Sequence, residues 1–287
     1  FISSIFFYKI ISERYNNNFF SIAFTFIYIS SPRIFAESFY NCKDIVFMSF
    51  CVYSIYFALK NFKSLTYKNL FLFSLFTAFA TNIRIMGIIL FLIFFIFLLL
   101  DCLENKNLFR KNIFRILFLL FSFPIFVYLF WPFLWSAPID NFLFTIKSSA
   151  NFKSFPGQGI LYLGSYYDAS NLPWHYIPVW ILITTPMILI LFFLSGLIIT
   201  STFLFQKILN LSEKNKLWNT SNEKKDFFML LFFLIPIFLV ILLNSTLYGG
   251  WRHLYFIYPC LVYLSAIGFF YVLRNNTFNK FKNIFYI

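Results

Sequence analysis

Long apolar stretches separated by short polar segments run along almost the whole chain, for example at 116–135, 177–205, 227–243 and 254–273. The hydrocarbon core of a bilayer requires about 20 consecutive apolar residues for each helical span. A helix satisfies its own backbone hydrogen bonds in lipid, and no alternating pattern typical of a transmembrane β-barrel appears. The pattern therefore predicts an all-α, polytopic transmembrane helical bundle in which residues 1–287 form a single domain.

Nine segments have the hydropathy expected of a membrane span. They lie at 1–12, 18–31, 45–60, 68–83, 85–101, 116–135, 176–206, 227–244 and 253–273. The second segment is short and the fourth and fifth are almost contiguous, so tilted or half-buried helices are an alternative for these three. Because the first residue is Phe1 and the first segment is only half a span long, we expect the sequence to begin partway through a helix.

The amino-acid composition excludes a soluble domain. Hydrophobic residues make up 61% of the chain and charged residues only 11%, whereas soluble domains carry about 25% charged residues. The four cysteines show neither a metal-binding spacing nor a paired framework, and we expect them to pack among apolar side chains. No Walker loop, dinucleotide fingerprint, HExxH or GxSxG motif occurs, so no site for a nucleotide-linked donor is visible.

Basic residues are distributed unequally between the two sets of loops. If the nine segments alternate across the membrane, most of the 23 Lys and Arg residues fall on one side, which the positive-inside rule identifies as cytoplasmic. The outer side retains Arg33, Lys43, Arg84, Lys147, Lys153 and Arg252. The net charge of +13 therefore reflects the topology of the chain. Binding to nucleic acid is not expected, because the sequence offers no soluble basic face.

The predicted outer loops, 31–44, 136–178 and 244–253, differ in composition from the inner ones. They are rich in Tyr, Trp, Gly, Pro and scattered charges. Polar loops that are held on a rigid scaffold commonly carry binding and catalytic residues. We therefore expect the chemistry of this protein to occur at its outer face.

An amphipathic helix is predicted in the longest outer loop. Pro138 is placed to open it, and Ile139, Phe142, Leu143 and Ile146 would then share one face. Such a helix either lies on the outer leaflet or packs as an ordinary loop helix on the protein.

Two ionisable residues stand where apolar segments begin or end. Asp44 precedes the apolar segment that starts at Ile45, so it is either a helix cap or a rigidly held general base or metal ligand. Arg84 lies within 82–87, between two apolar runs. An ionisable residue at membrane depth indicates function, whereas at the interface it is a snorkelling side chain.

A second basic group, Arg252 and His253, follows the aromatic stretch 248–251 and allows the same two interpretations. Arginine offers the bidentate geometry that suits a phosphate, and a cluster of Arg, Lys and His at the outer interface suits a lipid phosphate.

The longest outer loop contains two aromatic groups, which are Tyr166, Tyr167 and Asp168, and Trp174, His175 and Tyr176. Aromatic faces and carboxylates bind sugar hydroxyls, but the stretch 168–171 also has the composition of a turn. Trp and Tyr are typical of the membrane interface. His175 is therefore either a phosphate or hydroxyl partner or a hydrogen-bonded interface residue.

Four stretches resemble segments of the integral-membrane GT-C glycosyltransferases, and most closely the bacterial relatives of protein O-mannosyltransferases and aminoarabinose transferases. They are 31–44 (SPRIFAESFYNCKD), 82–87 (NIRIMG), 161–186 (LYLGSYYDASNLPWHYIPVWILITTP) and 248–259 (YGGWRHLYFIYP). The first resembles the family's Arg-containing segment that leads to an Asp opening the next helix. The third is similar to the Pro-Trp-aromatic entry into a late helix. The resemblance keeps its order over nearly the whole chain.

The resemblance implies inverting transfer of one sugar from a polyprenyl-phosphate donor to a lipid, glycan or protein hydroxyl, on the outer face of a bacterial inner (plasma) membrane. It implies that the donor phosphate contacts Arg84, Arg252, Lys43 and His175, and that Asp44 is the second acid or holds a divalent cation. The implied sugar or acceptor residues are Glu37, Tyr40, Tyr166, Tyr167, Asp168, Trp174 and Tyr176. The family's first helix and principal catalytic acid would precede residue 1, so we expect this fragment to be inactive.

Three alternatives remain at the level of the sequence. A transporter or lipid flippase would show internal repeats and broken helices with ionisable residues at the midplane, and no repeat is seen. An O-antigen polymerase or ligase would share the large outer loop and the lipid-phosphate donor. A structural membrane subunit would not require polar outer loops.

Overall fold

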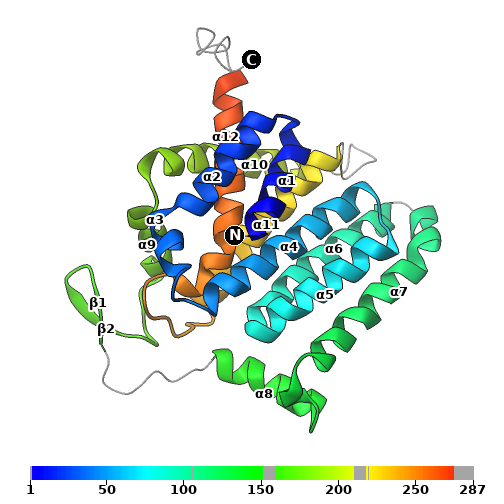
Figure 1. Cartoon of the computed structure of the whole chain (residues 1–287), viewed down its shortest axis with the longest axis horizontal. Coiled ribbons are helices and arrows are strands. Elements are labelled where there is room, and N and C mark those ends of the chain that lie inside the picture. The colour runs from blue at the N-terminus through cyan, green and yellow to red at the C-terminus, as the bar shows by residue number, and fades with distance from the viewer. Residues whose placement is uncertain (1, 105, 151–158, 210–217, 219, 275–287) are drawn as a thin grey trace.

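The computed structural model describes residues 2–104, 106–150, 159–209, 218 and 220–274, and shows a helical bundle with one small β-hairpin beside it (Figure 1). In chain order the elements are α1 (Ile2–Tyr15), α2 (Asn18–Ser30), α3 (Pro32–Glu37), α4 (Asp44–Lys63), α5 (Tyr67–Ile83), η1 (Ile85–Gly87), α6 (Ile88–Glu104), α7 (Lys106–Leu129), η2 (Pro132–Leu134), α8 (Pro138–Ala150), β1 (Gly159–Tyr162), β2 (Ser165–Asp168), α9 (Tyr176–Thr184), α10 (Met187–Leu209), α11 (Ser221–Leu242), η3 (Arg252–Ile257) and α12 (Tyr258–Arg274). The helical bundle expected from the hydropathy pattern is therefore present.

The bundle has two chemically different ends. At one end, here called the basic end, Arg14 of α1 pairs with Asp226 at the start of α11, with 2.8 Å between Nη2 and Oδ2. Lys207 of α10 reaches Glu223 of α11 at the same end. The opposite end, here called the loop end, consists of α3, the start of α4, the α5–α6 connection and the segment 244–257. The helices α4, α5 and α6 run between these two ends.

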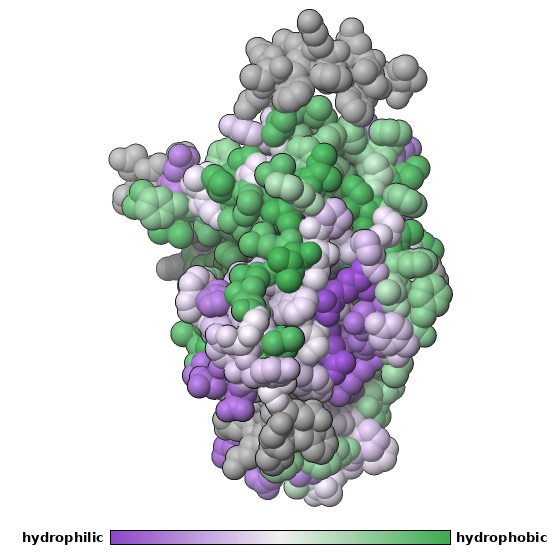
Figure 2. Space-filling model, turned by 90° about the vertical axis from the view of Figure 1, so that its left-hand side faces the viewer, coloured by the Kyte–Doolittle hydropathy of each residue, from purple (hydrophilic) through white to green (hydrophobic). Residues whose placement is uncertain are grey.

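Six helices in the described part of the chain are long and apolar enough to cross a membrane. They are Asp44–Lys63, Ile85–Glu104, Asn112–Leu129, Met187–Leu209, Ser221–Leu242 and Arg252–Leu273. The helices α1, α2 and α5 are shorter, with 14, 13 and 17 residues. Figure 2 shows broad hydrophobic areas around a compact hydrophilic patch on one face of the molecule. The structure thus supports six candidate spans, fewer than the nine segments expected from hydropathy.

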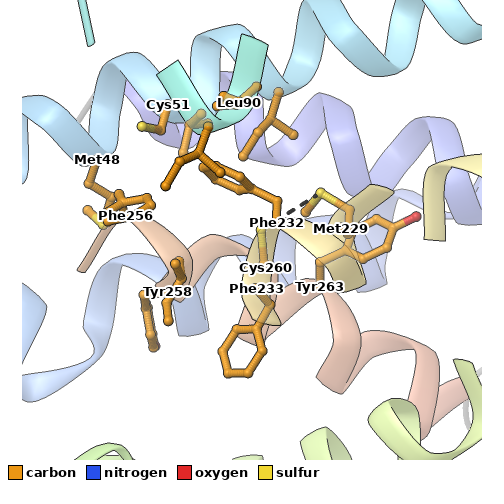
Figure 3. Packing of buried hydrophobic residues seen from close by; sticks show 14 of the residues in the cluster. Met48, Cys51, Leu90, Met229, Phe232, Phe233, Phe256, Tyr258, Cys260 and Tyr263 are labelled. Atoms are coloured by element: carbon orange, nitrogen blue, oxygen red, sulfur yellow. Dashed lines mark hydrogen bonds between the residues drawn. The ribbon is translucent and has the colours of Figure 1, made fainter. Parts of the chain in front are cut away.

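Helix α12 forms the centre of the core. Its residues are buried along most of its length, including Tyr258 and Tyr263, and Cys260 lies 4.0 Å from the Met229 sulfur of α11 (Figure 3). The expectation that cysteines serve as packing residues is confirmed for Cys51, Cys102 and Cys260, whereas Cys42 is exposed. By contrast, α10 exposes large apolar side chains on its outer surface, for example Ile188 and Ile198.

Two glycines let α10 and α12 approach closely. A Cβ atom at Gly196 would collide with the carbonyl oxygen of Leu264, and one at Gly268 would collide with the carbonyl oxygen of Phe192. Because these neighbours are backbone atoms, no change of rotamer can relieve the clash. Ser265 also donates a hydrogen bond of 3.2 Å to the carbonyl of Leu189 across this contact. Small residues at a helix crossing permit such close backbone packing in membranes.

The segment 176–206, expected as one span, is two helices. Helix α9 ends at Thr184, Thr185 is extended (φ −107°, ψ 137°), and α10 begins after Pro186. Proline lacks a backbone N–H and disfavours the helical conformation at the preceding residue. The expected span is therefore corrected to a short helix at the loop end followed by the longer α10.

The expected outer loop 136–178 contains structure of two kinds. The predicted helix after Pro138 is confirmed as α8, on which Ile139, Leu143 and Ile146 are exposed while Phe142 contacts Trp131. Residues 151–158, which include Lys153, lie outside the described residues. An antiparallel hairpin, β1–β2, follows and was not expected in an all-α chain.

The reason for the hairpin lies in its turn. Leu163 (φ 48°) and Gly164 (φ 82°) both adopt the left-handed conformation, as a two-residue turn between antiparallel strands requires. Leucine rarely adopts a positive φ. Turns of this kind usually contain Asn-Gly or Asp-Gly, whereas this turn contains Leu163-Gly164. The sequence therefore contains no signal for the hairpin.

Replacement of Gly196 by Val tests the close crossing of α10 and α12. We expect the variant to lose about 3 kcal/mol of stability or more, because overpacking a backbone contact costs about 1–3 kcal/mol even where side chains can move. The measurement is thermal unfolding of the purified protein in detergent. Ile198→Ala on the exposed face of α10 serves as the control and should change stability by less than about 0.5 kcal/mol. Equal melting temperatures for Gly196→Val and the wild type would contradict the crossing.

Candidate functional site

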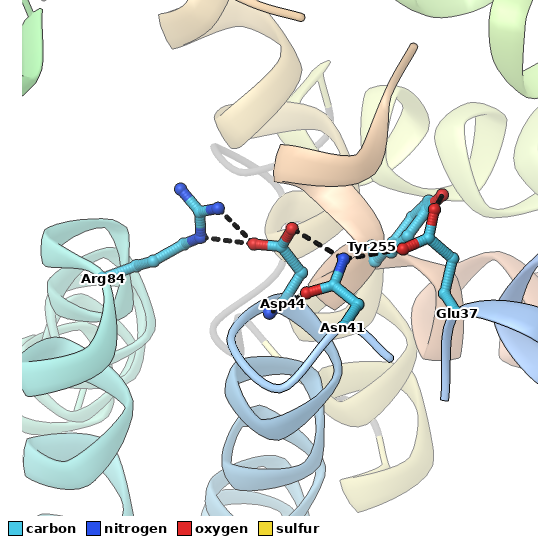
Figure 4. Close-up of polar contacts among 5 residues, drawn as sticks. All are labelled: Glu37, Asn41, Asp44, Arg84 and Tyr255. Carbon is cyan, nitrogen blue, oxygen red and sulfur yellow. Dashed lines mark hydrogen bonds and ion pairs between the residues drawn. The ribbon is translucent and has the colours of Figure 1, made fainter. Parts of the chain in front are cut away.

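The loop end brings together residues from α3, α4, the α5–α6 connection and η3 (Figure 4). Asp44 is the first residue of α4 and is buried. The residue at the N-cap position is Lys43, whose side chain makes no capping hydrogen bond. The backbone N–H of Asp44 instead donates 2.9 Å to the Asn41 Oδ1 atom. Asp44 therefore does not act as the cap, and its carboxylate is free to face other side chains.

The carboxylate of Asp44 faces the guanidinium of Arg84. The Arg84 Nε atom donates 2.7 Å to Asp44 Oδ1, and Nη2 contacts the same oxygen. Arg84 sits at the C-cap of α5 with an extended backbone. A Cβ atom at Gly87 would collide with the backbone of Thr81, so glycine is needed for the tight connection into α6. This connection aims Arg84 at the start of α4.

Asn41 extends the Asp44–Arg84 pair toward a second carboxylate. Its Nδ2 atom donates 3.0 Å to Asp44 Oδ2 and 2.7 Å to Glu37 Oε2. The hydroxyl of Tyr255 in η3 donates 3.2 Å to the other Glu37 oxygen, Oε1. Glu37 and Tyr255 are both buried. A continuous polar chain, Arg84–Asp44–Asn41–Glu37–Tyr255, thus crosses the loop end.

Arg33 closes the far end of this polar chain. Its Nε atom donates to the Tyr255 hydroxyl, and Nη2 donates 2.8 Å to the carbonyl oxygen of Gly249. The guanidinium also lies 5.4 Å from the Trp180 ring centroid. Gly250 has a φ of 72°, and a Cβ atom there would lie 2.9 Å from Arg33 Nη2. Both the positive φ and the close approach of Arg33 favour glycine at this position. Arg33 therefore ties α3 to the segment that precedes η3.

Two side chains with unpartnered nitrogen atoms, Arg252 and His253, lie beside this polar chain. The Arg252 guanidinium lies 4.4 Å from the Tyr248 ring centroid, and the Tyr248 and His253 rings are 4.6 Å apart. Arg252 Nε and His253 Nε2 are buried and make no hydrogen bond with any described residue. His253 lies within electrostatic range of Arg84, Asp44, Arg252 and Lys43. Unsatisfied buried donors of this kind indicate a place for water or a ligand.

The aromatic groups of the longest loop form a separate cluster. His175 Nδ1 lies 2.7 Å from the Tyr162 hydroxyl, and the structure describes no contact between His175 and the Asp44 pair. Burial raises the pKa of Tyr162, so its phenol is protonated at neutral pH and can donate to His175. Tyr176 is buried against Tyr162, with ring centroids 5.0 Å apart. His175 is therefore hydrogen-bonded to Tyr162 and lies apart from the polar chain at the loop end.

Among the sugar-site candidates in this loop, Tyr166, Asp168 and Trp174 are exposed, whereas Tyr167 is half-buried. Tyr166 is 77% exposed and Trp174 is 70% exposed. Asp168 ends β2 and accepts 2.9 Å from the Asn171 backbone, which confirms the expected turn at 168–171. The hairpin connects to the loop end through a backbone hydrogen bond of 3.2 Å from Leu247 to the carbonyl of Ala169. These side chains are accessible from outside and do not line the polar chain.

Comparison with protein-family models, curated proteins and solved structures finds no match to this chain. The functional proposal therefore depends on the arrangement of residues at the loop end.

The donor atoms near Asp44 do not favour a metal ion. Among the described residues, no group of three or more His, Cys, Asp or Glu side chains is placed to hold one. The carboxylate of Asp44 is neutralised by Arg84, and that of Glu37 accepts from Asn41 and Tyr255. The structure thus assigns these carboxylates to hydrogen bonds and an ion pair.

Sequence reasoning missed Arg33, Asn41 and Tyr255 as members of the site. A signal for Arg33 was present, because Arg33 and Glu37 are four residues apart within α3 and side chains at that spacing share a helix face. Asn41 lies in the turn after α3. Tyr255 is 218 residues from Glu37 along the chain. No local pattern in the sequence could have identified that contact.

A double-mutant cycle on Asp44 and Arg84 tests the ion pair. Each single change, Asp44→Asn or Arg84→Gln, should reduce stability by about 2–3 kcal/mol, because it leaves the partner charge buried and unpaired. The double variant should lose less than the sum of the two, since neither charge remains. The measurement is chemical or thermal unfolding in detergent, with the exposed Asp168→Asn as the control. Strict additivity of the two single changes would show that these side chains do not interact.

Proposed function

We propose that the protein is an integral-membrane glycosyltransferase of the GT-C type, which moves a sugar from a polyprenyl-phosphate donor to a lipid, glycan or protein acceptor on the outer face of a bacterial inner membrane. The observation that carries the proposal is the pair of buried nitrogen atoms without a described partner, Arg252 Nε and His253 Nε2, beside the Asp44–Arg84 pair and the exposed Lys43. A phosphate at the membrane interface would satisfy such groups.

The proposal extends the six candidate spans to nine crossings, by adding α1, α2 and α5. Helix α5 starts close to the end of α4 and finishes at Arg84, next to the start of α4. It therefore covers the same distance as α4, although it has only 17 residues. Helix α2 likewise leads from the basic end, where α1 finishes, to α3 at the loop end. In the proposed topology the basic end is cytoplasmic, as the positive-inside rule requires, and the exposed face of α8 contacts the outer leaflet.

In the proposed mechanism Arg252 and Lys43 neutralise the phosphate as it leaves the sugar, and the neutral imidazole of His253 offers it a hydrogen bond. Positive groups that are fixed where negative charge develops stabilise the transition state electrostatically. The charge of Arg84 is partly compensated by Asp44. In the proposed mechanism Arg84 therefore holds Asp44 in position and adds to the positive electrostatic potential at the phosphate. We further propose that Asp44 and Glu37 orient an acceptor hydroxyl and that Tyr40, which is exposed, contacts the acceptor.

A polytopic transporter or lipid flippase is the main alternative, and the break between α9 and α10 is a feature that such proteins share. That break lies at Thr185 and Pro186 and carries no ionisable side chain. An O-antigen polymerase or ligase would use the same lipid-phosphate chemistry at the same residues. The experiment below separates phosphate recognition from transport of an uncharged lipid.

Binding of undecaprenyl phosphate to the purified protein tests the proposal. The probe should bind the wild type in detergent, and Arg252→Gln should weaken binding about ten-fold or more, because a charge-assisted hydrogen bond contributes about 1.5–3 kcal/mol. Lys147→Gln on exposed α8 is the matched control, and undecaprenol without the phosphate is the control lipid. Equal affinity for the two lipids, or equal affinity of Arg252→Gln and wild type, would refute phosphate recognition at this site.

A further inference from the structure

A polar cavity lies at the basic end, opposite the site described above. It has a volume of about 480 Å³ and opens between the ends of α1 and α4 and the start of α11. Small-molecule sites in proteins have volumes of about 300–1,000 Å³. The side chains around it are all polar or charged, and those that matter here are Glu13, Asn16, Lys63, Ser221, Asn222 and Lys225. A cavity without apolar lining, in a chain that is 61% hydrophobic, suits a charged ligand.

Lys225 is the residue that points to a ligand. Its side chain is only 5% exposed, and Nζ lies 3.7 Å from Glu13 Oε2, which is beyond hydrogen-bond distance. It makes no hydrogen bond with any described residue, although an ammonium group carries three donors. The neighbouring Lys224 differs, because it hydrogen-bonds Asp101 and lies over the Phe62 ring. Lys224 is therefore satisfied within the protein, whereas Lys225 has donors available to the cavity.

Two further features make the cavity positive. Lys63 at the end of α4 is exposed and has no ion pair within the described part of the chain. The cavity also meets the first turn of α11, where Thr220 accepts from the Glu223 backbone N–H. Backbone N–H groups at the start of a helix, here those of Ser221 and Asn222, lack intrahelical partners and attract anions. Two ammonium groups and a helix N-terminus outweigh the single carboxylate of Glu13.

We propose that this cavity is a second site, which binds an oxyanion of the phosphate class. The ligand is either the headgroup phosphodiester of an anionic membrane lipid or free inorganic phosphate. In both cases the phosphoryl oxygens accept from Lys225 and Lys63 and from the first N–H groups of α11. The site is separate from the loop end and does not depend on the proposed transferase activity.

The test measures binding of two probes to the purified protein. Inorganic phosphate, compared with chloride at equal ionic strength, is followed through the melting temperature in detergent, because a ligand that binds only the folded state stabilises it. Phosphatidylglycerol, compared with phosphatidylcholine, is followed through lipid retention in native mass spectrometry. The variants are Lys225→Met, which keeps the buried stem, and the exposed Lys63→Gln, which leaves the fold intact. Lys60→Gln is the matched control, since Lys60 is on the same helix but does not line the cavity.

We expect one of the two probes to bind, with the same affinity for the wild type and for the Lys60→Gln control. Its affinity should fall about ten-fold in Lys225→Met, or ~1.4 kcal/mol, and about three-fold in Lys63→Gln. A response to phosphatidylglycerol alone identifies a lipid headgroup as the ligand, and a response to inorganic phosphate identifies the free anion. If neither probe distinguishes the wild type from Lys63→Gln and Lys225→Met, the site does not exist.

Discussion

The cost of burying charge in an apolar surrounding governs the whole structure. An unpaired buried charge is far more expensive than a paired one, and this chain has few charges with which to form pairs. Its ionic groups therefore lie at the two ends of the bundle, where backbone and side chains can compensate them. The Asp44–Arg84 pair is the clearest case, because it holds the start of α4 against the end of α5. The polar chain through Glu37 and Tyr255 then fixes α3 and η3 relative to that pair.

Most of the helical bundle could be predicted from hydropathy, because apolar length decides which segments can cross a membrane. The failures are local and have definite causes. Pro186 divides the expected span 176–206, and its effect was hidden by the apolar residues on both sides. The hairpin was missed because its turn places Leu163 at a positive φ, which its residue type does not suggest. In both cases the secondary structure depends on the backbone conformation of one or two residues, which the average hydropathy of the segment does not report.

Some members of the candidate site could be predicted from the sequence, but the contacts between them could not. Asp44, Arg84 and Arg252 were recognisable because charges are scarce in such a chain, so each one is conspicuous. Their pairing was not recognisable, since Asp44 and Arg84 meet only through the packing of α4 on α5. For His175 the sequence left two roles open, and the structure adds the contact of its Nδ1 atom with the Tyr162 hydroxyl, 13 residues away along the chain. Residue type identifies candidates, whereas tertiary contacts decide which of them act together.

The two ends of the bundle compensate positive charge differently. At the basic end, Arg14, Lys207 and Lys224 each contact a carboxylate on another helix, whereas Lys225 lies 3.7 Å from Glu13 and keeps donors for the polar cavity. At the loop end only Arg84 has such a partner, and Arg252 and His253 keep buried nitrogen atoms without one. Most buried polar groups in native proteins have a hydrogen-bond partner, so an unsatisfied one requires an explanation. Under the proposed function, an anionic phosphate at the membrane interface is the partner of these atoms at the loop end.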